Sequence, residues 1–261
     1  METRGFGVLT LNIWNVNEPL DTRLEALARF LTVEEPEFVL LQEVSPIEAT
    51  VESSRIAAMA GYKYHWYQES GEWEGRKEGV AILSKTPIEV IGTVVLPEAP
   101  DDMGRVAQRA AARVDESGHR VELVNTHLAF RPEATKSRVA QALRILEELA
   151  RDNRRLGLPM VLGGDLNDMP ESETLRTITS WPAPPFADAW SAMHPHQTED
   201  TFSVDNRWAA AALQPGRRID YILVSPGIRV QSCDIVLSGK RGSPTVSDHY
   251  GVMARCAHMD A

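Results

Sequence analysis

Residues 108–127 read QRAAARVDESGHRVELVNTH, and this stretch decides the class of fold. Two strand-like segments, 108–115 and 120–127, flank the turn sequence ESGH, which is a pattern typical of a β-hairpin. A hairpin joins antiparallel strands, whereas parallel strands need a long crossover connection. The segment therefore argues against a purely parallel sheet.

Strand–helix–strand units lie on both sides of this hairpin. Upstream, a strand over 7–14 is followed by a helical pattern from Asp21, a plausible N-cap, to Val33. The next strand, 38–44, is almost entirely apolar, which is typical of a strand covered on both faces. Downstream, the strong helical pattern of 134–156 ends at Gly157. Hairpins mixed with such units predict an α/β fold of two mixed sheets packed together, with helices outside.

The other elements are predicted from shorter patterns, and no repeat, low-complexity tract or long linker separates them. Ser45 is expected to cap a helix that runs towards Gly61, and a further helix is expected over 171–181. Strands are expected over 62–67, 79–84, 88–96, 159–163, 219–224, 230–237 and 251–256.

The composition suits one well-buried domain over residues 1–261, because 43% of the 261 residues are hydrophobic. The formal net charge of −10 argues against broad, non-specific binding of duplex nucleic acid, which needs clustered Lys and Arg. It leaves nucleic-acid substrates open, since an acidic enzyme can carry a local basic rim. Two cysteines are too few for a disulfide-stapled scaffold.

The N-terminal segment METRGFGVLTLNIWN lacks the basic start, apolar stretch and cleavage site of a secretory signal. The sequence contains no run of about 18 apolar residues, so no membrane span is predicted. We therefore expect a cytoplasmic protein, although a chain from which a signal had been trimmed would look the same.

Polar residues stand at the ends of most of these strands. A single charged residue there is usually solvated, and a lone Asp–His pair is usually a turn. Burying such groups singly is costly, but gathered together they can share a metal ion and hydrogen bonds. The complete ordered set therefore favours a functional site. It comprises Asn12, Glu43, His127, Asp165, Asn167, Asp220, Asp248 and His249.

The residue types indicate phosphate-ester chemistry. Hydrolysis of a phosphodiester needs neutralised phosphate charge and an activated water. Mg²⁺ prefers carboxylate and amide oxygens, which Glu43, Asn12 and Asp248 can supply as metal ligands. If the GDLND segment is extended, Asp165 and Asn167 point the same way and both face the cleft.

The ordered motifs LTLNIWN, LLQEV, EGVAILSK, VNTHL, GGDLND, RRIDYIL and SDHYG resemble the endonuclease/exonuclease/phosphatase family over nearly the whole chain. That family includes pancreatic-type deoxyribonucleases, AP endonucleases, neutral sphingomyelinases, inositol-phosphate 5-phosphatases and tyrosyl-DNA phosphodiesterases. The resemblance implies a four-layer α/β/β/α sandwich and a hydrolase of phosphate esters that uses Mg²⁺ or Mn²⁺.

The resemblance also implies catalytic roles. Asp165 orients or activates the water, and Asn167 donates to the phosphate or the transition state. Asp220 matches the carboxylate that orients His249, which can exchange a proton near neutral pH. The sequence leaves open whether His249 or Asp165 is the formal base.

Further candidate residues come from the same resemblance. His127 is expected to stabilise or protonate the leaving group, with Glu78 behind it to orient the ring, although Glu78 reads equally as a surface glutamate. Arg109 lies where many members bind the substrate phosphate; the alternative is an exposed strand arginine. Trp14 stands where AP endonucleases carry an acidic residue, which disfavours that branch.

Residues in or near loops supply a second group of candidates. Four aromatic residues are candidates to stack on a base or hold a lipid headgroup, although packing is the commoner role of such rings. Four basic residues are candidates for an anion-attracting rim or for ordinary solvated charge. They are Trp66, Tyr67, Trp73 and Trp208, and Arg217, Arg218, Lys240 and Arg241.

The leading hypothesis is a divalent-metal-dependent phosphodiesterase or nuclease. The alternatives are a phosphomonoesterase acting on inositol phosphates or other small phosphates, and a non-catalytic binding module for phosphate ligands. Nucleic acid, nucleotides, phospholipid headgroups and inositol phosphates all remain open as substrates, and no obligate protein partner is expected.

Overall fold

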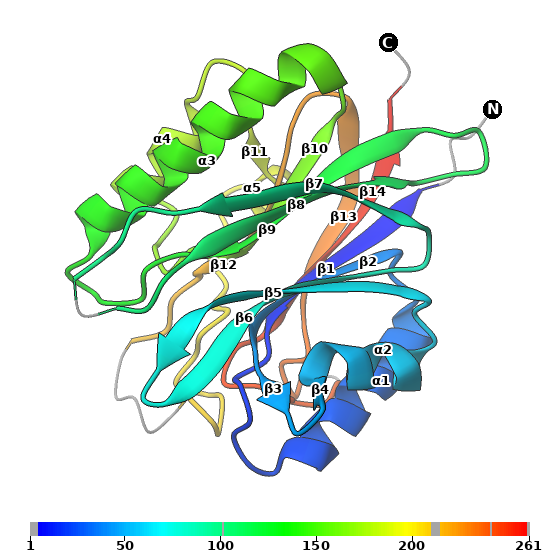
Figure 1. Cartoon of the computed structure of the whole chain (residues 1–261), viewed down its shortest axis with the longest axis vertical. Helices are drawn as coiled ribbons and strands as arrows, with labels where there is room; N and C mark the ends of the chain where they lie inside the picture. The colour runs from blue at the N-terminus through cyan, green and yellow to red at the C-terminus, as the bar shows by residue number, and fades with distance from the viewer. Residues whose placement is uncertain (1–4, 101, 210–214, 241, 260–261) are drawn as a thin grey trace.

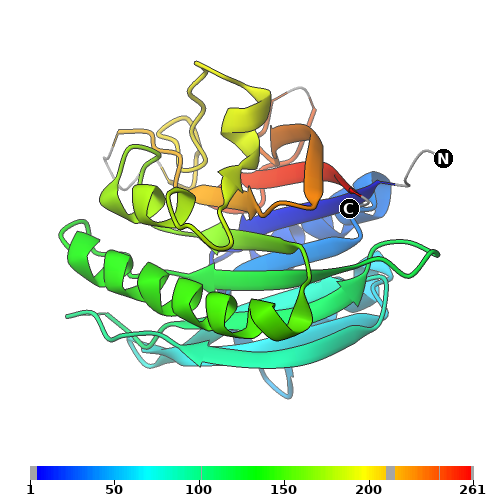
Figure 2. The same cartoon turned by 90° about the horizontal axis from the view of Figure 1, so that it is seen from above.

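Two mixed β-sheets lie face to face, and helices cover the outer face of each (Figures 1 and 2). The computed structural model describes residues 5–100, 102–209, 215–240 and 242–259. The predicted four-layer α/β/β/α sandwich is therefore confirmed.

The first sheet has six strands in the order β13–β14–β1–β2–β6–β5. Within it β1 and β2 are parallel, whereas the other neighbours are antiparallel. The strands are β1 (Phe6–Asn12), β2 (Phe38–Val44), β5 (Tyr64–Trp73), β6 (Arg76–Ser84), β13 (Ile228–Val236) and β14 (Gly251–His258).

The second sheet has the order β11–β12–β10–β9–β8–β7. Here β9 and β10 form the parallel pair, and the predicted hairpin is formed by the antiparallel strands β8 and β9. The strands are β7 (Ile88–Val95), β8 (Val106–Arg113), β9 (Arg120–His127), β10 (Met160–Asp165), β11 (Ala187–Asp188) and β12 (Asp220–Val224).

Helices α1 (Leu20–Glu34) and α2 (Glu52–Ala60) cover the first sheet, and α3 (Thr135–Leu156) and α4 (Glu173–Thr179) cover the second (Figure 1). The helical pattern predicted after Asp21 is confirmed, since Leu24, Leu27, Ala28 and Leu31 of α1 are buried at a 3.6-residue spacing. A third apolar layer, contributed by strands of both sheets, fills the space between them.

The segment after Ser45 differs from the prediction. Ser45 does not begin a helix; a short hairpin of β3 (Pro46–Ile47) and β4 (Thr50–Val51) intervenes, and α2 begins at Glu52. The Glu52 carboxylate instead accepts a hydrogen bond from the backbone N–H of Ser45. The short helix α5 (Ala189–Met193) and strand β11 were not predicted, because neither is long enough to show a periodic pattern. Within the described ranges, no helix has the length and apolarity to cross a membrane.

Candidate active site

Strands from both sheets end at one edge of the sandwich, around a cleft of about 630 Å³. The cleft falls within the size range of small-molecule sites. Most of the predicted site residues line it, namely Glu43, Glu78, His127, Asp165, Asn167, Asp248 and His249. Asn12 and Asp220 are fully buried beside them.

Asn12 links the two sheets directly. Its side-chain Nδ2 donates to Glu43 Oε1 at 2.8 Å and to Asp165 Oδ2 at 3.1 Å. Its Oδ1 accepts from the backbone N–H of Trp14 at 3.0 Å. An amide oxygen has two lone pairs, so one remains for a cation. Asn12 thus holds the two carboxylates at a fixed spacing.

Glu43 reaches the cleft through an irregularity in β2. The ladder with β6 pairs Leu41 with Ala81 and then Val44 with Gly79, so two residues oppose one, as in a β-bulge. Glu43 has φ = 53°, in the left-handed region. Burial, reinforced by the nearby charges of Glu78 and Asp248, raises the pKa of Glu43 to about 8.

Asp165 ends β10 and is buried. The preceding Gly164 has φ = 148°, and a Cβ there would lie 1.9 Å from the Thr126 carbonyl oxygen, so only glycine lets β10 approach β9 this closely. Burial and the charge of Asp220 raise the pKa of Asp165 to about 6. The carboxylate is therefore largely ionised at neutral pH.

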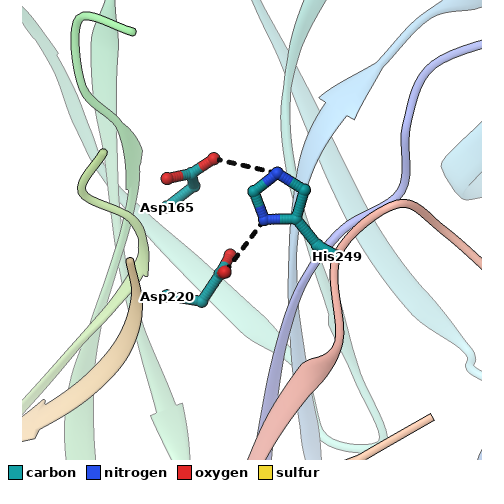
Figure 3. Close-up of side chains that lie close together, drawn as sticks. All are labelled: Asp165, Asp220 and His249. Atoms are coloured by element: carbon teal, nitrogen blue, oxygen red, sulfur yellow. Dashed lines mark hydrogen bonds and ion pairs between the residues drawn. The ribbon is translucent and has the colours of Figure 1, made fainter. Parts of the chain in front are cut away.

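His249 and Asp220 form the predicted dyad, as Figure 3 shows. His249 Nδ1 lies 2.9 Å from Asp220 Oδ2, and its Nε2 lies 3.7 Å from Asp165 Oδ2. Burial alone would lower the pKa of His249, but Asp220, Asp165 and Asp248 outweigh it and hold the pKa well above its usual value. The ring is therefore cationic at neutral pH.

His127 faces Asp165 from the other side, with 3.5 Å between Nε2 and Oδ2. Burial and the neighbouring Arg105 and His249 hold the pKa of His127 well below its usual value, so the ring is neutral. Glu78 does not stand behind it as predicted. Its carboxylate accepts from Asn15 Nδ2 at 3.1 Å and lies 4.0 Å from Arg105 Nη1.

Asn167 lines the cleft as expected, but a turn and not an extended segment places it there. The GDLND segment is not extended, since Asn167 has φ = 52° and its backbone N–H donates to Asp165 Oδ1 at 2.9 Å. This Asx-type turn re-aims the chain after the strand. The Asn167 side chain donates to the Leu128 carbonyl at 3.1 Å, which fixes its position at the rim.

Arg109 was predicted to bind substrate, and the structure contradicts this. Alternation along β8 points Gln108 into the space between the sheets and Arg109 to the opposite face, under α3. There Arg109 is buried in ion pairs of 2.7 Å with Glu122 and 2.7 Å with Asp152. Its role is structural.

Arg105 occupies the cleft instead and was missed. It precedes the first residue of β8, so no periodic pattern distinguishes it from Arg109. Its Nε and Nη2 donate to Asp102 at 3.2 and 2.8 Å, which leaves Nη1 towards Glu78. Asn15, Arg76, Phe130 and Arg131 also line the cleft and were missed, since single loop residues carry no pattern.

The candidate loop residues divide between the cleft and the core. Trp73 and Arg217 line the cleft. Trp66 and Tyr67 belong to β5 and pack against apolar layers on its two faces, which contradicts a substrate-contacting role. Trp208 packs on Trp14, with 5.5 Å between ring centroids.

The remaining basic candidates are held by acidic partners. Arg218 pairs with Asp188 at 2.8 Å, and Lys240 pairs with Glu199 at 3.3 Å. Arg241 lies outside the described residues. Among the described residues of this basic group, Arg217 therefore lies where it can contact an anion bound in the cleft.

The chemistry of the donors fits a divalent cation. Glu43, Glu78 and Asp248 share one small cleft, and the pKa of each is raised, first by burial. Carboxylates crowded in this way are stabilised in their charged form by a bound hard cation. Asp165, Asp220 and His249 also place ligand atoms within 4.8 Å of one another. His249 and Asp220 already form a hydrogen bond with each other.

Residues 9–249 match the model of the Endonuclease/Exonuclease/phosphatase family, and the chain belongs to that family. Its members hydrolyse phosphate esters. No curated protein sequence matches the chain significantly.

Solved structures show the same fold at low sequence identity. The human Nocturnin catalytic domain with bound sulfate anion has a TM-score of 0.74 at 19% identity, covering 98% of this chain and 95% of that chain. Caenorhabditis elegans TDP2 has a TM-score of 0.75 at 22% identity, covering 97% and 74%. A Bacteroides thetaiotaomicron mannosyl-6-phosphatase has a TM-score of 0.74 at 19% identity, covering 97% and 99%.

Proposed function

We propose that this protein is a Mg²⁺- or Mn²⁺-dependent phosphodiesterase. The observation that carries the proposal is the convergence of Glu43, Asp165 and the His249–Asp220 dyad on one cleft. Glu43 and Asp248, with the remaining lone pair of Asn12, would hold the cation, which when bound neutralises charge on the phosphate.

The protein's own groups divide the remaining work. Asp165 lies beside the imidazoles of His127 and His249 and is the base for the attacking water, because the carboxylates around His249 raise its pKa and favour its protonated form. Asp220 fixes His249 Nδ1 so that Nε2 faces the cleft and stabilises negative charge. Neutral His127 acts as a hydrogen-bond donor to the phosphate or leaving group, with Asn167 and Arg105 as further donors.

The experiment that tests this function is a substrate panel with metal added and removed. It compares single- and double-stranded DNA, RNA, nucleotide esters, sphingomyelin and inositol phosphates, with bis-p-nitrophenyl phosphate as a generic diester. We expect EDTA to abolish diester hydrolysis and Mg²⁺ or Mn²⁺ to restore it. Turnover that persists in EDTA would refute the mechanism, and ligand binding without turnover would indicate a binding module.

A phosphomonoesterase is the second candidate. Arg76, Arg105 and Arg217 line the same cleft and supply charge for the additional negative charge of a monoester. The monoester arms of the panel, including inositol phosphates and mannose 6-phosphate, distinguish the two. Higher kcat/KM on these than on the diesters would favour the phosphomonoesterase.

One wall of the cleft is suited to an aromatic part of the substrate. Trp73 and Phe130 meet edge to face, with ring centroids 5.2 Å apart, and the Arg131 guanidinium lies 4.7 Å from the Phe130 centroid. We expect Trp73→Ala to raise KM about tenfold for nucleotide esters, because stacking of a base contributes about 1–3 kcal/mol. The kcat should change little, since the ring is expected to contact the base and not the reacting phosphate.

Steady-state kinetics on a nucleotide diester and on a glycerophosphodiester measure this effect. Trp181→Ala is the control, because Trp181 packs beside the α3 layer and does not line the cleft. An equal rise in KM for the ring-free diester would argue against stacking.

A further inference from the structure

A buried polar network crosses the space between the two sheets directly beneath the cleft. Its members Thr10, Gln42, Gln108 and Asn125 are all fully buried. Gln42 Nε2 donates to Asn125 Oδ1 at 2.8 Å and to Thr10 Oγ1 at 3.1 Å. Buried amides in an otherwise apolar layer are costly unless fully hydrogen-bonded, so their position requires an explanation.

Asn125 connects this network to the backbone of the other sheet. From β9 in the second sheet, its Nδ2 donates to the carbonyls of Leu41 at 3.0 Å and Ala81 at 2.9 Å in the first. Leu41 and Ala81 are the last regular pair of the β2–β6 ladder before the bulge. A bulge disrupts the ladder, so the backbone groups beside it need partners from elsewhere.

The bulge determines which way Glu43 faces. Val39, Leu41 and Val44 all pack in the apolar layer under α1 and α2, whereas Gln42 faces the other sheet. In an unbroken strand Glu43 would share the face of Val39 and Leu41, and Val44 would not. The inserted residue resets the alternation, and Glu43 in its left-handed conformation is the residue turned into the cleft.

We infer that Asn125 is a positioning residue for Glu43: its amide clamps the β2 bulge from the opposite sheet and so holds the Glu43 carboxylate at the cleft. Asn125 stands two residues before His127 in the same strand. One strand of the second sheet therefore positions both His127 and, through the bulge, Glu43. For its metal-binding readout the inference rests on the proposed function.

The test replaces Asn125 and follows Glu43 itself. Asn125→Asp removes both donors with little change of size, and Asn125→Thr removes the amide but suits a strand, so it serves if the first variant fails to fold. We expect crystal structures to show Glu43 displaced by about 1 Å or more, a misplacement of the size that can cost about 10²-fold in rate. Titration with Mn²⁺, followed by electron paramagnetic resonance, should show affinity at least tenfold weaker.

The matched control is Gln108→Met. Gln108 belongs to the same buried network, accepting from Asn125 Nδ2 at 3.3 Å and donating to the Trp66 carbonyl at 2.9 Å, but it does not contact the bulge. We expect it to lower the melting temperature comparably while leaving the Glu43 conformation and Mn²⁺ affinity unchanged.

Three outcomes separate the possibilities. A folded Asn125 variant in which the bulge and the Mn²⁺ affinity are both unchanged would overturn the inference. A loss of Mn²⁺ affinity in Gln108→Met equal to that in the Asn125 variants would also overturn it. If the wild-type protein binds no Mn²⁺, the proposed metal chemistry fails, and the position of Glu43 in the crystal structures still decides the role of Asn125.

Discussion

Glu43→Gln is expected to lower kcat by about 10³-fold or more on bis-p-nitrophenyl phosphate, with the fold intact. Its carboxylate is the cleft group turned inward by the bulge and tied to Asp165 through Asn12. Loss of the metal's charge stabilisation removes several kcal/mol from the transition state, and each 1.36 kcal/mol is a factor of ten in rate. Excess Mn²⁺ should restore part of the activity, because the amide oxygen is a weaker ligand in the same place.

The measurement is kcat as a function of Mn²⁺ concentration, with far-ultraviolet circular dichroism to verify folding. Glu74→Gln is the matched control, because Glu74 is an exposed carboxylate lining the same cleft. If both variants lose activity equally, general electrostatics of the cleft explain the effect. If Glu43→Gln retains wild-type kcat, Glu43 is not a metal ligand.

His249→Ala is expected to lower kcat by about 10²- to 10³-fold, the usual cost of removing a group that stabilises negative charge in the transition state. The cationic ring stabilises charge beside Asp165 and is held in place by Asp220 at 2.9 Å. Asp220→Ala should cost nearly as much, since it removes the acceptor that fixes the ring.

Because the two residues act as a unit, the double variant should be little worse than His249→Ala alone. His194→Ala is the control, because that ring stacks on Trp190 away from the cleft. Multiplicative losses in the double variant would show that Asp220 and His249 act independently.

The sequence predicted what repeats along the chain. Strand and helix periods predicted two mixed sheets packed together with helices outside, and the family resemblance implied the four layers. The polar residues at the ends of apolar strands identified groups that converge on the cleft. These predictions succeeded because burial imposes alternation on strands and a 3.6-residue period on helices.

Single-residue features were not predictable in the same way. Arg105 and Arg109 are both plausible phosphate ligands in sequence, and only the pleat of β8 places one in the cleft and the other under α3. The bulge at Glu43 depends on Asn125, whose contacts with Leu41 and Ala81 span 84 and 44 residues of the chain. Such long-range contacts leave no local pattern.

One divalent cation is expected to bind at Glu43, and anomalous diffraction from crystals soaked in Mn²⁺ tests this most directly. We predict a single strong peak in contact with the Glu43 carboxylate, facing Asp248 and Asp165. A peak held instead by Asp165, Asp220 and His249, or no peak under conditions that support turnover, would contradict it.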